Sequence, residues 1–178
     1  WCGSYPEAQT CRGSQGECMS PEILRDLVLV LVPLILSLAV HEYAHAATAY
    51  WLGDDTAALQ GRFTLNPISH IDPMGSLVVP GLLVVMGAGV WFGWAKPVPF
   101  NPARFTRRIR MKHAVMLTAA AGPLSNLALA VICALAHGVL GANESARALL
   151  QPMVFLNVAL FLFNLLPIHP LDGGKVLM

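Results

Sequence analysis

Long runs of uncharged, mostly apolar residues constrain this chain more than any other feature of its sequence. Asp, Glu, Lys and Arg are all missing from residues 27–40, 75–95, 114–136 and 148–171. A transmembrane helix needs about 20 mostly apolar residues, and the first run reaches that length when it continues to residue 52. A domain of 178 residues has too little interior to hide several such helices from water. We therefore predict an all-α polytopic membrane protein with three core transmembrane helices.

Composition agrees with a lipid bilayer as the surrounding solvent. Charged residues make up 12% of the chain and hydrophobic residues 56%, whereas soluble domains carry about 25% charged residues. The formal net charge is +1. A balance this close to neutral does not indicate nucleic acid as a partner.

The most costly residues of the first apolar run stand together in the sequence HEYAH. Between residues 27 and 52 the only ionisable acid or base side chains are His41, Glu42 and His45. Positions i and i+4 share one face of a helix, so the two histidines can present nitrogens to one metal ion, with Glu42 beside them. Ionisable groups in a membrane helix are usually functional. Hydrogen bonding between helices is the alternative, and it explains neither the spacing nor the glutamate.

A catalytic zinc ion takes three protein ligands and keeps one position open. Among the acids outside the first helix, Asp172 is the only one flanked by apolar sequence, in NLLPIHPLDGG. Two prolines beside it indicate broken backbone, which membranes tolerate where it lines a wet cavity. From these residues alone, Asp172 fits a third ligand and a helix cap equally well.

Three motifs in order resemble the site-2 protease family of intramembrane zinc metalloproteases. They are HEYAH in a transmembrane helix, GPLSN in a later span and NLLPIHPLDGG after it. GRFTLNPISHIDPMG and GWAKPVPFNP are similar to the compact prokaryotic branch of that family, and the resemblance covers residues 23–178. It implies one zinc ion per chain, held by His41, His45 and Asp172, with Glu42 as the catalytic carboxylate.

The resemblance also implies a substrate and a reaction. The enzyme would hydrolyse peptide bonds within or near transmembrane segments of other membrane proteins, as in regulated intramembrane proteolysis. Asn126 and Asn164 would bind the opened substrate backbone. From the residues alone, hydrogen bonding between helices is the simpler role for both. His169 departs from the family pattern, which has proline there. A zinc transporter or metal-binding membrane protein is one alternative class, although it does not need Glu42 beside His41. A catalytically silent relative that acts as a scaffold is another, and the intact HEYAH and LDGG argue against it.

Two segments between the first two long runs are expected near the site. Residues 59–66, LQGRFTLN, alternate apolar and polar side chains, which predicts a short β-hairpin arm. An unwound substrate could add to its edge, although an ordinary structural hairpin fits as well. Residues 75–95 carry five glycines and Pro80. For His41 and Asp172 to meet at one depth, the two segments that carry them should run in the same direction. Residues 114–136 already supply one crossing between these segments. Residues 75–95 should therefore not cross the membrane fully, and we predict a re-entrant segment.

Charge predicts the orientation in the membrane. Residues 53–112 hold seven Lys or Arg, which marks that side as cytosolic, in a bacterial plasma membrane by the family resemblance. Residues 1–22 form an extramembrane N-terminal segment, and residues 23–178 the protease core. Cys2, Cys11 and Cys18 of that segment would then face an oxidising exterior. We expect the chain to be a piece of a longer protein that continues beyond Met178.

Overall fold

The computed structural model describes residues 21–87, 96–106, 109–141, 143–168 and 171–176. The expectations for Cys2, Cys11, Cys18 and His169 concern residues outside these ranges. The described helices are α1 (Pro21–Trp51), α2 (Thr56–Leu59), η1 (Pro67–Ser69), η2 (Pro73–Val78), α3 (Val79–Val85), η3 (Pro102–Arg104), α4 (Met111–Leu140), α5 (Glu144–Asn164) and α6 (Asp172–Val176).

Three of the described helices are long and apolar enough to cross a membrane. The spans are Leu24–Trp51, Met111–Leu140 and Glu144–Asn164, with mean hydropathies of 2.1, 1.8 and 1.7. Helices α1, α4 and α5 have 31, 30 and 21 residues, or about 46, 45 and 32 Å, against a bilayer core of about 30 Å. Large apolar side chains such as Ile132, Leu135 and Phe155 are exposed on α4 and α5. Lipid is the solvent in which such surfaces are stable. The prediction of three core helices able to span a membrane is confirmed.

Helix α1 ends where its sequence predicts, within one residue. Gly53 has φ = +101°, a left-handed conformation that costs glycine little. Its N–H donates to the Tyr50 carbonyl at 3.0 Å, and the Asp54 N–H donates to the Ala49 carbonyl at 2.9 Å. These bonds satisfy carbonyls that the end of a helix leaves free. The chain therefore turns directly after the histidine-bearing part of α1.

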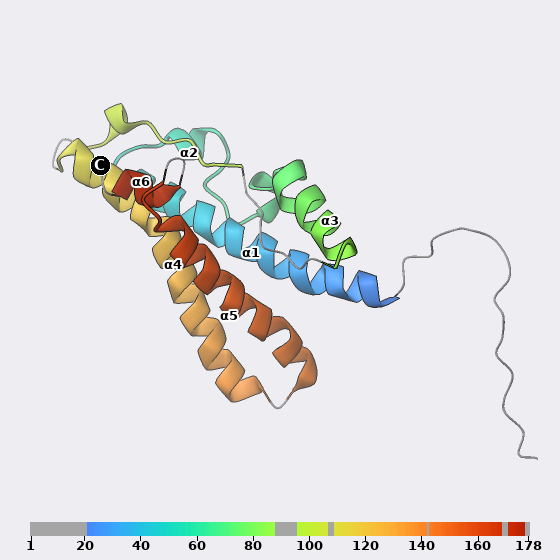
Figure 1. The fold of residues 1–178 in the computed structure, drawn as a ribbon. Coiled ribbons are helices and arrows are strands. Elements are labelled where there is room, and N and C mark those ends of the chain that lie inside the picture. Colours follow the sequence, from blue (N-terminus) through green and yellow to red (C-terminus); the bar gives the residue numbers. More distant parts are fainter. Residues whose placement is uncertain (1–20, 88–95, 107–108, 142, 169–170, 177–178) are drawn as a thin grey trace, which may run out of the picture.

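The three long helices meet at one end of the molecule. Figure 1 shows α4 running away from α6 and α5 returning to it, while α1 also runs toward that end. Small residues make the close contacts of α4: Ala114, Ala119, Gly122 and Ala130 are buried. Between α5 and α1, Asn157 Nδ2 donates to Ser37 Oγ at 2.8 Å. Thus α1 and α5 share a direction, which brings the end of α1 and the segment after α5 together.

The strand predicted over residues 59–66 is wrong. Leu59 is the last residue of α2, and no strand occurs among the residues that the structure describes. The Gly61 N–H donates to Ala58 at 3.0 Å, and the Asn66 N–H donates to Thr64 Oγ1 at 3.0 Å. Such local bonds give the backbone an alternative to the hydrogen bonds between β-strands.

The apolar–polar alternation of this segment has another cause. The ring of Phe63 stacks on Tyr43 and Tyr50 of α1, with centroids 5.4 and 5.1 Å away. One partly buried aromatic side chain thus anchors the loop to α1. No strand partner is needed to explain the pattern.

The apolar run that begins at residue 75 folds as a short helical segment in its described part. Asp72 Oδ1 accepts from the N–H groups of Met74 and Gly75 at 3.0 and 2.9 Å, which starts η2. Helices η2 and α3 together cover Pro73–Val85 and lie beside α1 (Figure 1). Thirteen helical residues reach about 20 Å, short of a full crossing. Residues 88–95 lie outside the described ranges, so a re-entrant path stays a prediction.

Candidate metal centre

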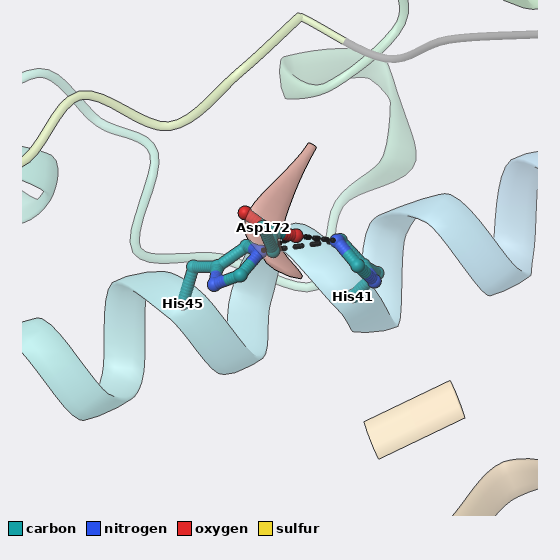
Figure 2. A group of neighbouring side chains, drawn as sticks. All are labelled: His41, His45 and Asp172. Atoms are coloured by element: carbon teal, nitrogen blue, oxygen red, sulfur yellow. Dashed lines mark hydrogen bonds and ion pairs between the residues drawn. The ribbon is translucent and has the colours of Figure 1, made fainter. Parts of the chain in front are cut away.

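Three side chains that are far apart in the sequence converge at the meeting point of α1, α4 and α6. His41 and His45 lie one turn apart on α1, and Asp172 opens α6. The two Nε2 atoms are 3.0 Å apart, and each lies 3.2 Å from Asp172 Oδ2. All three residues are buried. Figure 2 shows the imidazoles and the carboxylate turned toward one point.

These atoms suit a tetrahedral metal ion. Zinc bonds of about 2.0–2.1 Å place neighbouring ligands of a tetrahedron about 3.3 Å apart, close to the 3.0–3.2 Å found here. Two imidazole nitrogens and a carboxylate oxygen form a common donor set for catalytic zinc. The residues present therefore fit a zinc ion with three protein ligands.

Helix α4 comes unusually close to the two histidines. A Cβ added to Gly122 would lie 2.7 Å from His41 Cε1 and closer still to His45 Nε2, so any side chain there would occupy the space of the imidazoles. Pro123 follows directly, inside α4. Proline removes one helix hydrogen bond, the one that the Ala119 carbonyl would otherwise accept, and disturbs the turn before it. The Gly-Pro of GPLSN thus shapes α4 around the candidate centre.

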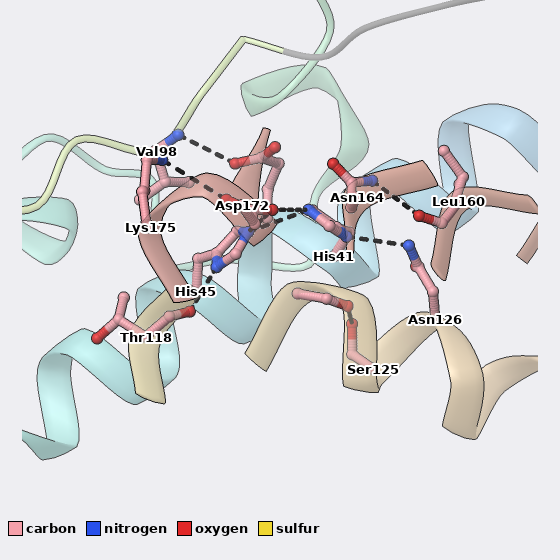
Figure 3. A network of polar contacts seen from close by, with 12 residues as sticks. His41, His45, Val98, Thr118, Ser125, Asn126, Leu160, Asn164, Asp172 and Lys175 are labelled. Carbon is pink, nitrogen blue, oxygen red and sulfur yellow. Dashed lines mark hydrogen bonds and ion pairs between the residues drawn. The ribbon is translucent and has the colours of Figure 1, made fainter. Parts of the chain in front are cut away.

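Each imidazole has a second partner on α4 (Figure 3). His45 Nδ1–H donates to the Thr118 carbonyl at 2.7 Å, which leaves the Nε2 lone pair for a metal. On the other imidazole, Nδ1 of His41 lies 2.9 Å from Asn126 Nδ2. Asn126 is 0% exposed and does not line the cavity described below. Its partner is a candidate ligand.

The two oxygens of Asp172 face different groups. Oδ2 faces the histidines, whereas Oδ1 lies 3.5 Å from Lys175 Nζ, one turn on along α6. An ionised Asp172 could bind a metal ion through Oδ2, because a metal ligand of this kind must be deprotonated.

Gly173 lets α6 dock against the end of α5. A Cβ at this position would collide with the backbone carbonyls of Leu165 and Leu166. Backbone cannot move aside as a flexible side chain can, so only glycine fits. The glycine after Asp172 in LDGG therefore fixes where the carboxylate stands.

Glu42 lies beside the candidate ligands at the wall of a cavity. Its Oε2 accepts a hydrogen bond from the Val98 N–H at 3.0 Å, and the residue is 8% exposed. The cavity has a volume of about 600 Å³. Its walls are mostly apolar and come from α1, α4, α5, α6 and the segment around Val98; they include Leu38, Phe100, Ala119, Leu160, Phe163, Asn164, Leu166, Ile168 and Leu171.

The structure brings most of the predicted site residues together. His41, His45 and Asp172 form one cluster, Glu42 lines the adjoining cavity, and Asn164 lines it too. Asn164 Nδ2 donates to the Leu160 carbonyl at 2.9 Å within its own helix.

Three contacts of the site were not expected from the sequence. Thr118 and Val98 act through backbone groups, which no residue type reveals. Lys175 had a signal, because a cation three residues after Asp172 in a helix faces the same side. GPLSN was recognised in the sequence as a motif. The steric role of its Gly-Pro could not be, because that role depends on how α4 packs against α1.

Comparisons with known proteins show similarity to zinc metalloproteases. The sequence model of peptidase family M50 matches residues 140–178. "Putative zinc metalloprotease YwhC" of Bacillus subtilis is 44% identical over 157 residues, which cover 83% of this chain and 67% of that protein.

More distant relatives carry the same kind of name. "Putative zinc metalloprotease Rip2" of Mycolicibacterium smegmatis is 34% identical over 154 residues, which cover 82% of this chain and 54% of that protein. Its namesake in Mycobacterium tuberculosis is 34% identical over 158 residues, which cover 84% and 56%. The chain thus spans about two thirds of the Bacillus protein and just over half of the mycobacterial ones. No solved structure matches the chain with significance.

Proposed function

The chain belongs to the site-2 protease family of zinc metalloproteases, peptidase family M50, and we propose that it hydrolyses peptide bonds within or near transmembrane segments of other membrane proteins. One observation carries the proposal. The Nε2 atoms of His41 and His45 and Oδ2 of Asp172 lie within 3.2 Å of one another, and Glu42 lines the adjoining apolar cavity. The cavity lies among helices long enough to span a bilayer.

His41, His45 and Asp172 would hold the zinc ion. Bound zinc supplies an activated water and polarises the scissile carbonyl. Glu42 takes a proton from the attacking water and passes it to the leaving nitrogen. The Val98 N–H keeps the Glu42 carboxylate oriented toward the cavity for both transfers.

The cavity suits an apolar segment whose helix has opened. A helical substrate hides its peptide bonds in its own hydrogen bonds, so it must unwind locally before attack. Leu160, Phe163 and Leu171 offer apolar contacts to substrate side chains. Asn164 stands in the same wall, and we assign it to the opened backbone, whose polar groups need partners away from water.

Orientation follows from charge. Residues 53–112 carry seven Lys or Arg, which places them on the cytosolic side of a bacterial plasma membrane. The N-terminal segment then faces outward, and α6 lies on the cytosolic side. Proteolysis at this depth would release the cytosolic part of a membrane-tethered protein.

The test co-expresses the chain with a panel of single-span membrane proteins that carry a tag at each end. The wild type should cut at least one of them near its span. Glu42→Gln keeps an oxygen that can accept from Val98 N–H but loses the base, so its rate should fall by about 10²- to 10⁴-fold. Its zinc content should stay at the wild-type level.

Two results would count against the proposal. Cleavage by Glu42→Gln at nearly the wild-type rate would show that Glu42 does not take part in the reaction. Zinc uptake into vesicles by the wild type, with no panel member cut, would favour the transporter alternative.

A further inference from the structure

Asn126 is a buried polar residue whose role the proposed chemistry leaves open. It is 0% exposed in the middle of α4, and its Nδ2 lies 2.9 Å from His41 Nδ1. Its Oδ1 has no hydrogen-bond partner among the residues that the structure describes. The side chain thus contacts a candidate zinc ligand and stands outside the cavity where a substrate would lie.

Metal binding dictates where the proton of His41 must be. A neutral imidazole carries one N–H, and a nitrogen that binds a metal cannot keep it. Nε2 of His41 faces Asp172 and His45, so Nε2 is the ligand atom. Nδ1 must then carry the hydrogen, and it requires an acceptor within reach.

Asn126 can provide that acceptor by a small change. A half turn of its amide exchanges Oδ1 and Nδ2 and hardly alters the shape of the side chain. The carbonyl oxygen then takes the place 2.9 Å from His41 Nδ1. We propose that Asn126 is a positioning residue that accepts the Nδ1–H of His41, fixes its tautomer and so holds Nε2 ready for zinc. This inference rests on the proposed zinc site and gives Asn126 a partner other than the substrate backbone.

The Thr118 carbonyl already has this role for His45. It accepts from Nδ1–H at 2.7 Å and orients Nε2 toward the same point. Partners of this kind set the orientation of metal-binding histidines and strengthen them as ligands. Asn126 completes the arrangement, because each imidazole then has one acceptor on α4.

Asn157 offers a matched control for the alternative that Asn126 only ties helices together. It is also 0% exposed and also joins α1 to a neighbouring helix. Its Nδ2 donates to Ser37 Oγ and to the Met153 carbonyl, each at 2.8 Å. Asn157 thus works as a donor, whereas our inference makes Asn126 an acceptor. Aspartate, which only accepts when ionised, separates the two.

The experiment measures the zinc affinity of the purified full chain by competition with a chromophoric chelator. Asn126→Leu should weaken zinc binding by about 10- to 100-fold, the usual cost of losing such a partner. Asn126→Asp should retain affinity at or above the wild-type level, because a carboxylate accepts from Nδ1–H more strongly than an amide. Asn157→Leu and Asn157→Asp should leave zinc affinity unchanged and lower the melting temperature.

The outcomes are separable from those of the proposed function. If wild type binds no zinc, the proposed function itself fails. If wild type binds zinc and Asn126→Leu binds it equally well, only this inference fails. A loss of about tenfold or more in Asn126→Asp would mean that Asn126 acts as a donor, and would also overturn it. Should Asn126→Leu not fold, the aspartate variant decides alone.

Discussion

Gly122 is the residue where the packing of α4 and the candidate metal centre constrain each other most tightly. The space that its Cβ would fill is taken by the imidazoles of His41 and His45. A helix can pass so close to two metal ligands only where it has no side chain. The glycine of GPLSN is therefore part of the centre, although it donates nothing to it.

Replacing Gly122 with alanine should disable zinc binding and leave the helix itself intact. The added methyl group would push His41 and His45 apart, so zinc affinity should fall by more than the about 10- to 100-fold caused by losing an outer hydrogen bond. Gly138→Ala, in the same helix, is the control, since nothing lies within 4 Å of its added Cβ. It should keep zinc and should not lower the melting temperature. Equal zinc affinity in the two variants would contradict this role for Gly122.

Whether a contact of the site could be predicted from the sequence depended on whether a side chain or the backbone makes it. The spacing of His41 and His45 and the glutamate between them could be read directly, because a helix places such positions on one face. The contacts from Thr118 and Val98 could not be, since any residue has a carbonyl and nearly any has an N–H. Asn126 was assigned by family resemblance, and its contact with His41 required knowing how α1 and α4 pack.

Helix α6 is short, and its position depends on the end of α5. It has five residues, and Gly173 packs against the carbonyls of Leu165 and Leu166. Asp172 stands directly before that contact. Small shifts of α6 therefore move the carboxylate relative to the histidines on α1.

Substituting alanine for Gly173 should withdraw Asp172 from the centre. The methyl group would meet backbone on both sides, so α6 must move outward as a unit. We expect zinc affinity to fall at least tenfold, about the loss caused by disturbing a ligand's surroundings. Helical content by circular dichroism should hardly change, because α6 has only five residues. Zinc binding at the wild-type level would show that the docking of α6 does not position the ligand.

Secondary-structure elements could be predicted where a single physical cause decides the structure. The first apolar run was expected to continue as a helix to residue 52, and α1 occurs as Pro21–Trp51, because a long apolar run leaves few alternatives to a helix. Residues 59–66 were expected as a strand. Their alternation instead reflects one aromatic anchor, Phe63 on Tyr43 and Tyr50, and turn-forming side chains at Thr64 and Asn66. A period-two pattern this short cannot distinguish a β-strand from a loop with one ring packed against a helix.

The molecule as a whole gathers the parts of the candidate metal centre at one end. The end of α1, the start of α4, the end of α5 and α6 lie together, whereas the connection between α4 and α5 lies at the far end (Figure 1). If all three long helices cross the bilayer, residues 53–112 and α6 share one side. In the orientation that we propose, the basic residues of that stretch mark this side as cytosolic.

Labelling of introduced cysteines tests this orientation. In a background in which the four native cysteines are replaced, Gln60→Cys and Ser145→Cys each place one thiol at an exposed position. A membrane-impermeant maleimide added to intact cells should label Ser145→Cys and should reach Gln60→Cys only after the membrane is opened. The reverse pattern would invert the orientation, and labelling of both in intact cells would mean that the helix between them does not cross.

The proposed function depends on one metal ion held jointly by α1 and α6. Elemental analysis of the full chain, purified without chelators, measures this most directly. Wild type and Glu42→Gln should each contain one zinc ion per chain, whereas His41→Ala, His45→Ala and Asp172→Ala should each contain far less. Full zinc content in Asp172→Ala, or none in the wild type, would contradict the account.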